Sequence, residues 1–153
     1  MIKLELRIPP LALFVLVAVA MQVLAGIVPS LAFTLPGKTV IAVGLASVGV
    51  LLGVAGLVSF RRAKTTFHPM RPEQASALVT SGIYRFSRNP MYLGVLFVLA
   101  GWGAQLANVI AFSGLVVFVA YLNRFQIAPE ERVLREKFGA AFAAYEKAVR
   151  RWI

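Results

Sequence analysis

The stretch Lys38–Phe60, KTVIAVGLASVGVLLGVAGLVSF, decides the class of fold to which this chain belongs. After Lys38 it contains no charged residue, and a helix needs about 20 consecutive apolar residues to cross the hydrocarbon core of a bilayer. The stretch therefore predicts a membrane-spanning helix over residues 38–60. Within it, Gly49 and Gly53 have the small-xxx-small spacing that allows two helices to approach closely, so we expect them to serve helix packing.

Three further apolar stretches flank this segment, at residues 9–28, 90–107 and 109–128. A short turn over residues 29–37 joins the first stretch to the second, and residues 105–108 join the third to the fourth. Connections this short leave no room for a domain, so each pair is expected to form an antiparallel hairpin. The sequence thus predicts an all-α polytopic membrane protein, with four transmembrane helices in two hairpins, as a single domain over residues 1–153.

The composition supports this class of protein. Hydrophobic residues make up 59% of the 153 residues, and a soluble domain of this length buries only about 70% of its surface, so such long apolar stretches would remain exposed. The chain has no cysteine and one histidine, His68, which excludes a Cys/His zinc site, an iron–sulfur cluster and a catalytic thiol. No metal site is expected, and His68 is interpreted as a solvated loop residue.

The charges indicate how the chain is oriented in the membrane. Fourteen of the sixteen Lys and Arg residues lie in the N-terminal segment, the loop 61–89 or the tail 129–153, and Arg124 lies near the same end of the fourth stretch, so only Lys38 lies on the opposite side. By the positive-inside rule, both termini and this loop are expected in the cytoplasm, in a bacterial inner membrane. A net charge of +10 could suggest nucleic acid, but these charges flank apolar spans and suit anionic lipid headgroups instead.

The tail 129–153 shows the pattern of an amphipathic helix. Its apolar residues recur at spacings of three and four: Val133, Leu134, Phe138, Phe142, Tyr145, Val149 and Trp152. Pro129 suits a helix start, and Gly139 is expected to divide the helix into two short pieces. The simplest interpretation is a helical tail lying on anionic lipid, with the bilayer as its partner.

Polar residues gather where the third apolar stretch begins. Tyr84, Arg85, Arg88, Asn89 and Tyr92 fall within nine residues, and each has an ordinary explanation as a membrane anchor or an interfacial aromatic residue. Pro90 suits the first turn of a helix. The two later spans, however, return the chain to the same membrane face, so Glu130 and Glu131 are expected near the arginines. Either a structural ion-pair network or a binding site results.

These residues resemble the signature of the membrane methyltransferases that include isoprenylcysteine carboxyl methyltransferases and phospholipid methyltransferases. The matching elements, in order, are Gly82-x-Tyr84, Arg88-Asn89-Pro90-Met91-Tyr92-Leu93-Gly94, Glu130-Glu131, Phe138-Gly139 and Tyr145. The resemblance covers about residues 65–152. The chain departs from the prenylcysteine enzymes at Asn89, where they have His; because Asn does not titrate near neutrality, cofactor binding rather than proton transfer is expected there.

The resemblance implies S-adenosyl-L-methionine as the cofactor. Its carboxylate would take Arg88 or Arg85, and its ammonium or ribose hydroxyls would take Glu130 or Glu131. Its sulfonium cation would lie against tyrosine faces. The implied cofactor-binding residues are Tyr84, Arg85, Arg88, Asn89, Pro90, Tyr92, Glu130, Glu131 and Tyr145, and the implied catalytic residues are Arg88 and Glu130.

The implied acceptor is lipophilic and enters from between the helices: an isoprenylcysteine-type carboxylate, a phospholipid amine or a thiol. Two alternatives stay open. One is an NADPH-dependent sterol or steroid reductase, because those families resemble this one around an Arg-x-x-Arg-His-Pro-x-Tyr element. The other is a non-enzymatic helical membrane protein whose polar residues only anchor and pair. The sequence leaves the oligomeric state open.

Overall fold

The computed structural model describes residues 5–65 and 70–153, and His68 and Thr66 lie outside these ranges. Within them the regular structure is helical, and the only β pairing is one isolated bridge between Ala32 and Asn108. The all-helical class predicted from the sequence is therefore confirmed for the described part of the chain.

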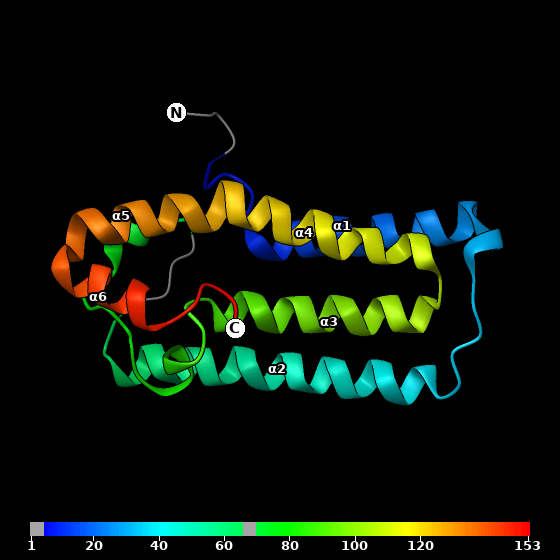
Figure 1. The fold of residues 1–153 in the computed structure, drawn as a ribbon, viewed down its shortest axis with the longest axis horizontal. Coiled ribbons are helices and arrows are strands. Elements are labelled where there is room, and N and C mark those ends of the chain that lie inside the picture. Colours follow the sequence, from blue (N-terminus) through cyan, green and yellow to red (C-terminus); the bar gives the residue numbers. More distant parts are fainter. Residues whose placement is uncertain (1–4, 66–69) are drawn as a thin grey trace.

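Four helices run along the long axis of the molecule (Figure 1). They are α1 (Pro10–Ile27), α2 (Lys38–Arg62), α3 (Pro90–Leu106) and α4 (Ser113–Tyr121), and the first three lie close to the predicted bounds. The fourth is part of a longer helical run from Val109 to Phe138. By length and composition, α1, α2 and this run can each cross a membrane, whereas α3 is apolar but has 17 residues.

The longer run consists of four helical pieces. A short 3-10 helix, η4 (Val109–Phe112), precedes α4, and a π-helical turn, η5 (Leu122–Ile127), joins α4 to α5 (Ala128–Phe138). Proline lacks an N–H and crowds the carbonyl four residues earlier, which is a recognised cause of local helix distortion. Pro129 is the second residue of α5, which begins directly after η5, so α5 continues the helix of the last span and does not start separately.

Glycines bring α2 and α3 together. A Cβ atom on Gly94 would lie 2.5 Å from the carbonyl oxygen of Gly49, and one on Gly101 would lie 2.7 Å from that of Ala42. Both distances are too short for any side chain, so the two backbones are in direct contact. The packing role predicted for Gly49 is confirmed, whereas a Cβ on Gly53 would meet no atom within 4 Å.

The hydrophobic core lies between α1, α3 and the α4 run. Met21, Leu99 and Phe118 are fully buried at its centre. The outward faces are apolar as well: Leu51 on α2 is 68% exposed and Val116 on α4 is 71% exposed. A surface of this kind is unfavourable in water and suits the acyl chains of a bilayer.

The tail differs in part from a surface helix. Gly139, at a φ of +50°, ends α5 and separates it from α6 (Ala140–Ala148), which confirms the predicted break. Residues 149–153 do not continue the helix. They turn back, and Figure 1 places the C-terminus beside the start of α3. Phe142 and Tyr145 of α6 are buried, so this helix packs on the protein and not only on lipid.

Candidate functional site

A cavity lies at the end of the bundle where α3 begins and where α5 and α6 fold over. Seven of the nine predicted binding residues line it: Tyr84, Arg88, Asn89, Tyr92, Glu130, Glu131 and Tyr145. Arg85 is exposed and is not among the lining residues, and Pro90 is buried in the first turn of α3 without lining the cavity.

Local sequence features shape the loop and the turn that place Tyr84 at the cavity. Gly82 has a φ of +63°, which glycine adopts without strain, and a Cβ there would lie 2.6 Å from Ser59 Oγ on α2. This turn leads into the short helix η3 (Gly82–Arg85), which carries Tyr84. On the preceding loop, Thr65 Oγ1 accepts hydrogen bonds from the N–H and the hydroxyl of Ser76, so Thr65 serves to hold this loop.

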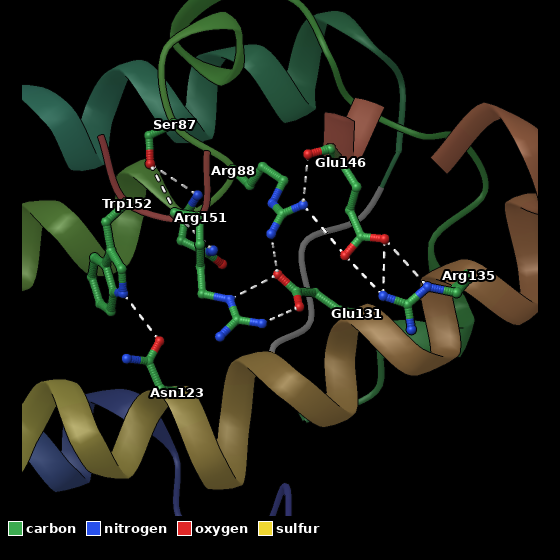
Figure 2. A network of polar contacts seen from close by, with 9 residues as sticks. Ser87, Arg88, Asn123, Glu131, Arg135, Glu146, Arg151 and Trp152 are labelled. Atoms are coloured by element: carbon green, nitrogen blue, oxygen red, sulfur yellow. Dashed lines mark hydrogen bonds and ion pairs between the residues drawn. The ribbon is translucent and has the colours of Figure 1, made fainter. Parts of the chain in front are cut away.

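Two of the lining residues, Arg88 and Glu131, belong to an ion-pair network (Figure 2). Arg88 Nη2 lies 2.9 Å from Glu131 Oε1, and the two side chains are 11% and 8% exposed. Arg88 Nη1 also lies 3.3 Å from Glu146 Oε1, and Arg135 pairs with the same glutamate at 2.8 Å. Ion pairs this buried require good geometry and several hydrogen bonds, because removing one member leaves an uncompensated charge.

One nitrogen atom in this network, Arg88 Nε, takes no part in these ion pairs. Arg88 Nε is buried, and no acceptor from the described residues hydrogen-bonds to it. A buried donor without a partner costs about 1–3 kcal/mol, which native proteins rarely accept without a functional reason. Because Arg88 lines the cavity, an anionic group bound there could accept this hydrogen.

The two adjacent glutamates have different environments. Glu130 Oε1 accepts hydrogen bonds from the Tyr92 hydroxyl at 2.6 Å and from Gln126 Nε2 at 2.5 Å. Consecutive residues on a helix point about 100° apart, so Glu130 meets α3 and the cavity while Glu131 faces the arginines. Glu130 therefore has only neutral partners among these hydrogen bonds, whereas Glu131 is neutralised by two guanidinium groups.

Aromatic residues form the apolar wall. The Tyr145 hydroxyl donates to the carbonyl oxygen of Tyr84 at 2.7 Å, and the rings of Phe60 and Tyr84 meet edge to face at 5.4 Å. Burial raises the pKa of Tyr145 to about 12 and raises the pKa of Tyr84 well above its ordinary value. Both phenols are consequently neutral at physiological pH and present uncharged ring faces.

The side-chain amide of Asn89 donates a hydrogen bond to the backbone. Its Nδ2 donates to the carbonyl oxygen of Arg151 at 3.0 Å, and its N–H donates to Ser87 Oγ at 3.1 Å. Sequence reasoning did not include Arg151, Glu146 or Gln126 in the site. The basic residues of the tail fit a lipid-facing surface equally well, and nothing in their spacing indicated that the chain turns back after α6.

Comparisons with known proteins agree with this arrangement. The family model described as phospholipid methyltransferase matches residues 38–141, which include both halves of the cavity. Protein-S-isoprenylcysteine O-methyltransferase A of Arabidopsis thaliana is 29% identical over 102 residues, 67% of this chain and 52% of the plant protein. The yeast (Saccharomyces cerevisiae) protein-S-isoprenylcysteine O-methyltransferase is 34% identical over 82 residues, 52% of this chain and 33% of the relative.

A shorter relative comes from Haemophilus influenzae, an uncharacterized protein that is 43% identical over 63 residues, 41% of this chain and 100% of its own length. No solved structure gives a significant match. The fold and the site define a helical membrane protein with a cavity, lined by apolar and charged side chains, at one end of its bundle. The chain belongs to the phospholipid methyltransferase family, which confirms the resemblance. It spans about half the length of the plant relatives that it matches.

Proposed function

We propose that this protein is a membrane methyltransferase that uses S-adenosyl-L-methionine to methylate a lipophilic acceptor. The observation that carries the proposal is the cavity lined by Arg88, Glu130 and three tyrosines, in which the buried Arg88 Nε has no hydrogen-bond acceptor among the described residues. Family membership and the names of the relatives support the same class of reaction.

The residues present suit this cofactor. Of the two arginines predicted to bind its carboxylate, Arg88 is favoured, because Arg85 is exposed outside the cavity. Of the two glutamates, Glu130 is favoured for the ammonium or ribose hydroxyls, because both oxygens of Glu131 are already bound by arginines. The faces of the tyrosines can stabilise a sulfonium cation at the cavity wall: Tyr84, Tyr92 and Tyr145.

The bound cofactor supplies an electrophilic methyl group, and the chain supplies position and the exclusion of water. Arg88 would hold the cofactor by its carboxylate, and Glu130 by its ammonium or ribose hydroxyls. A carboxylate or thiolate acceptor needs no general base, whereas an amine acceptor must lose a proton, to Glu130 or to solvent. Asn89 has a positioning role, since its amide is bonded to the backbone and does not titrate.

The acceptor is proposed to be lipophilic and to enter from between the helices. An apolar groove between α3 and α4 supports this route, and it is lined in part by Leu96, Phe97 and Val119. The chemical candidates are an isoprenylcysteine-type carboxylate, a phospholipid amine and a thiol. The names of the plant and yeast relatives favour the first of these.

We also propose that α3 is a fourth membrane span and that both termini face the cytoplasm of a bacterial inner membrane. At 1.5 Å per residue, 17 residues extend about 26 Å, which is slightly less than the hydrocarbon core. The contact of α3 with α2 along Gly94 and Gly101 supports a span in which α3 crosses the membrane alongside α2. The basic residues at the cavity end support the orientation.

Calorimetric titration of the purified protein in detergent tests the function. S-Adenosylhomocysteine is expected to bind to the wild type. Arg88→Ala is expected to lower its affinity roughly 10- to 100-fold, because a hydrogen bond to a charged group is lost. Arg85→Ala is the matched control and should bind like the wild type. Binding of NADPH in place of S-adenosylhomocysteine would favour the reductase alternative, and binding of neither would favour the non-enzymatic one.

A further inference from the structure

The last residues of the chain are bonded to the beginning of α3. After α6, Val149 adopts an extended conformation, and the carbonyl oxygen of Arg150 accepts the N–H of Arg88 at 3.0 Å. The carbonyl oxygen of Arg151 accepts from Asn89 Nδ2, and Trp152 Nε1 donates to Asn123 Oδ1 at 3.0 Å. Figure 2 shows this segment crossing beside the ion-pair network.

The side chain of Arg151 grips Glu131 with two parallel hydrogen bonds. Nε lies 3.1 Å from Oε1, and Nη2 lies 2.5 Å from Oε2. This is the bidentate geometry that planar guanidinium groups form with carboxylates. Arg88 reaches the same carboxylate through Nη2 alone, at Oε1.

Because Arg151 and Arg88 both bind the Glu131 carboxylate, Arg151 limits which nitrogen atoms of Arg88 can bind it. If Arg151 were absent, Glu131 would offer both oxygens to Arg88, and the bidentate pair would form between those two residues. That pair would engage Arg88 Nε or turn the guanidinium toward α5. With Arg151 in place, Arg88 is held by its Nη atoms, and its Nε stays without a protein acceptor in the described structure.

We propose that Arg151 is a positioning residue of the cofactor site, which occupies Glu131 so that Arg88 Nε is reserved for the carboxylate of the ligand. The inference rests on the proposed function and extends it to residues 149–153. These residues lie beyond the part of the chain that the family model matches, which ends at residue 141. The proposed site is thus completed by a segment outside the region that the family model matches.

The test compares two ligands on three variants by calorimetric titration in detergent. S-Adenosylhomocysteine carries the carboxylate, and methylthioadenosine lacks the whole amino-acid part. Arg151→Ala is expected to weaken the first ligand roughly tenfold and to leave the second within twofold of the wild type. Arg151→Lys keeps the positive charge but not the planar guanidinium group that forms two parallel hydrogen bonds, so it should recover only part of the lost affinity.

Arg150→Ala is the matched control. Its side chain is exposed, and the backbone carbonyl that bonds Arg88 is retained in the variant, so both ligands should bind as in the wild type. If Arg151→Ala proves too unstable to purify, Arg151→Lys carries the test through the same difference between the two ligands.

Equal weakening of both ligands by Arg151→Ala would overturn the inference, since it would mean that the segment only closes the cavity. Unchanged binding of S-adenosylhomocysteine by the variant would overturn it as well, while leaving the proposed function standing. Failure of the wild type to bind S-adenosylhomocysteine would refute the proposed function itself.

Discussion

Leu6 donates its backbone N–H to the carbonyl oxygen of Phe125 at 3.0 Å. In a regular α-helix that carbonyl would accept from the residue four positions later, which is Pro129 and has no N–H. The N-terminal segment therefore supplies a hydrogen bond that the proline cannot. It satisfies a backbone group at the π-helical turn η5, immediately before the two glutamates of the site.

Pro129→Ala tests whether this turn positions the site. Alanine restores a helical donor and favours a regular α-helix, which would rotate Glu130 away from Tyr92. We expect thermal stability to be unchanged or higher. Affinity for S-adenosylhomocysteine should fall roughly tenfold, which corresponds to the loss of one hydrogen bond to a charged group. Pro36→Ala, in the opposite turn, is the control, and an unchanged affinity in Pro129→Ala would contradict the role of η5.

Glu131→Ala should strongly destabilise the protein. It removes the nearer of the two carboxylate partners of buried Arg88 and the partner of Arg151, and breaking a buried ion pair costs about 3–5 kcal/mol. The measurement is the free energy of unfolding in mixed micelles. Glu136→Ala, an exposed position on the same helix, should change it by less than about 0.5 kcal/mol. Equal effects of the two variants would refute the structural role of the network.

Gly94→Ala should separate α2 from α3. The added methyl would lie 2.5 Å from the carbonyl oxygen of Gly49, so the backbones must move apart, at a cost of about 1–3 kcal/mol in unfolding free energy. Gly53→Ala is the control, because a Cβ there meets no atom within 4 Å and alanine favours the helix. The prediction is contradicted if Gly94→Ala unfolds at the same denaturant concentration as the wild type.

The absence of cysteine makes the topology directly testable. Single cysteines at Thr34 and Ala140, both exposed, can be labelled with a membrane-impermeant maleimide. In intact cells we expect labelling of Thr34→Cys only, and in inverted vesicles labelling of Ala140→Cys only. Labelling of both from the same side would rule out the proposed four-span topology.

Glu5 should contribute a pH-dependent term to stability. Hydrogen bonds from Arg124 and Arg132 lower the pKa of Glu5 below its ordinary value of 4.5. A lowered pKa in the folded state means that the stabilisation is fully present above pH 4.5 and is lost as the pH falls through the lowered pKa. Unfolding measured from pH 7 down to pH 3 should therefore show a steeper loss for the wild type than for Glu5→Gln. Parallel curves would contradict this contribution.

The sequence predicts the apolar helices correctly and brings seven of the nine predicted binding residues to one cavity, because each depends on a local pattern. The run over residues 38–60 is long and apolar enough to form a spanning helix, and the spacing from Arg88 to Tyr92 places those side chains at the start of one helix. What it could not predict depends on distant contacts. The bidentate pair of Arg151 with Glu131 joins α5 to a non-helical end, and the exposure of Arg85 results from the orientation of η3.

Arg88 and its ion-pair partner Glu131 lie on opposite sides of the α3–α4 segment in the sequence. During synthesis Arg88 leaves the ribosome before either apolar helix that separates it from its carboxylate. The cavity is therefore complete only after both helices have been synthesised and inserted. Chains stalled earlier lack Glu130 and Glu131, so the proposed binding site depends on completed insertion.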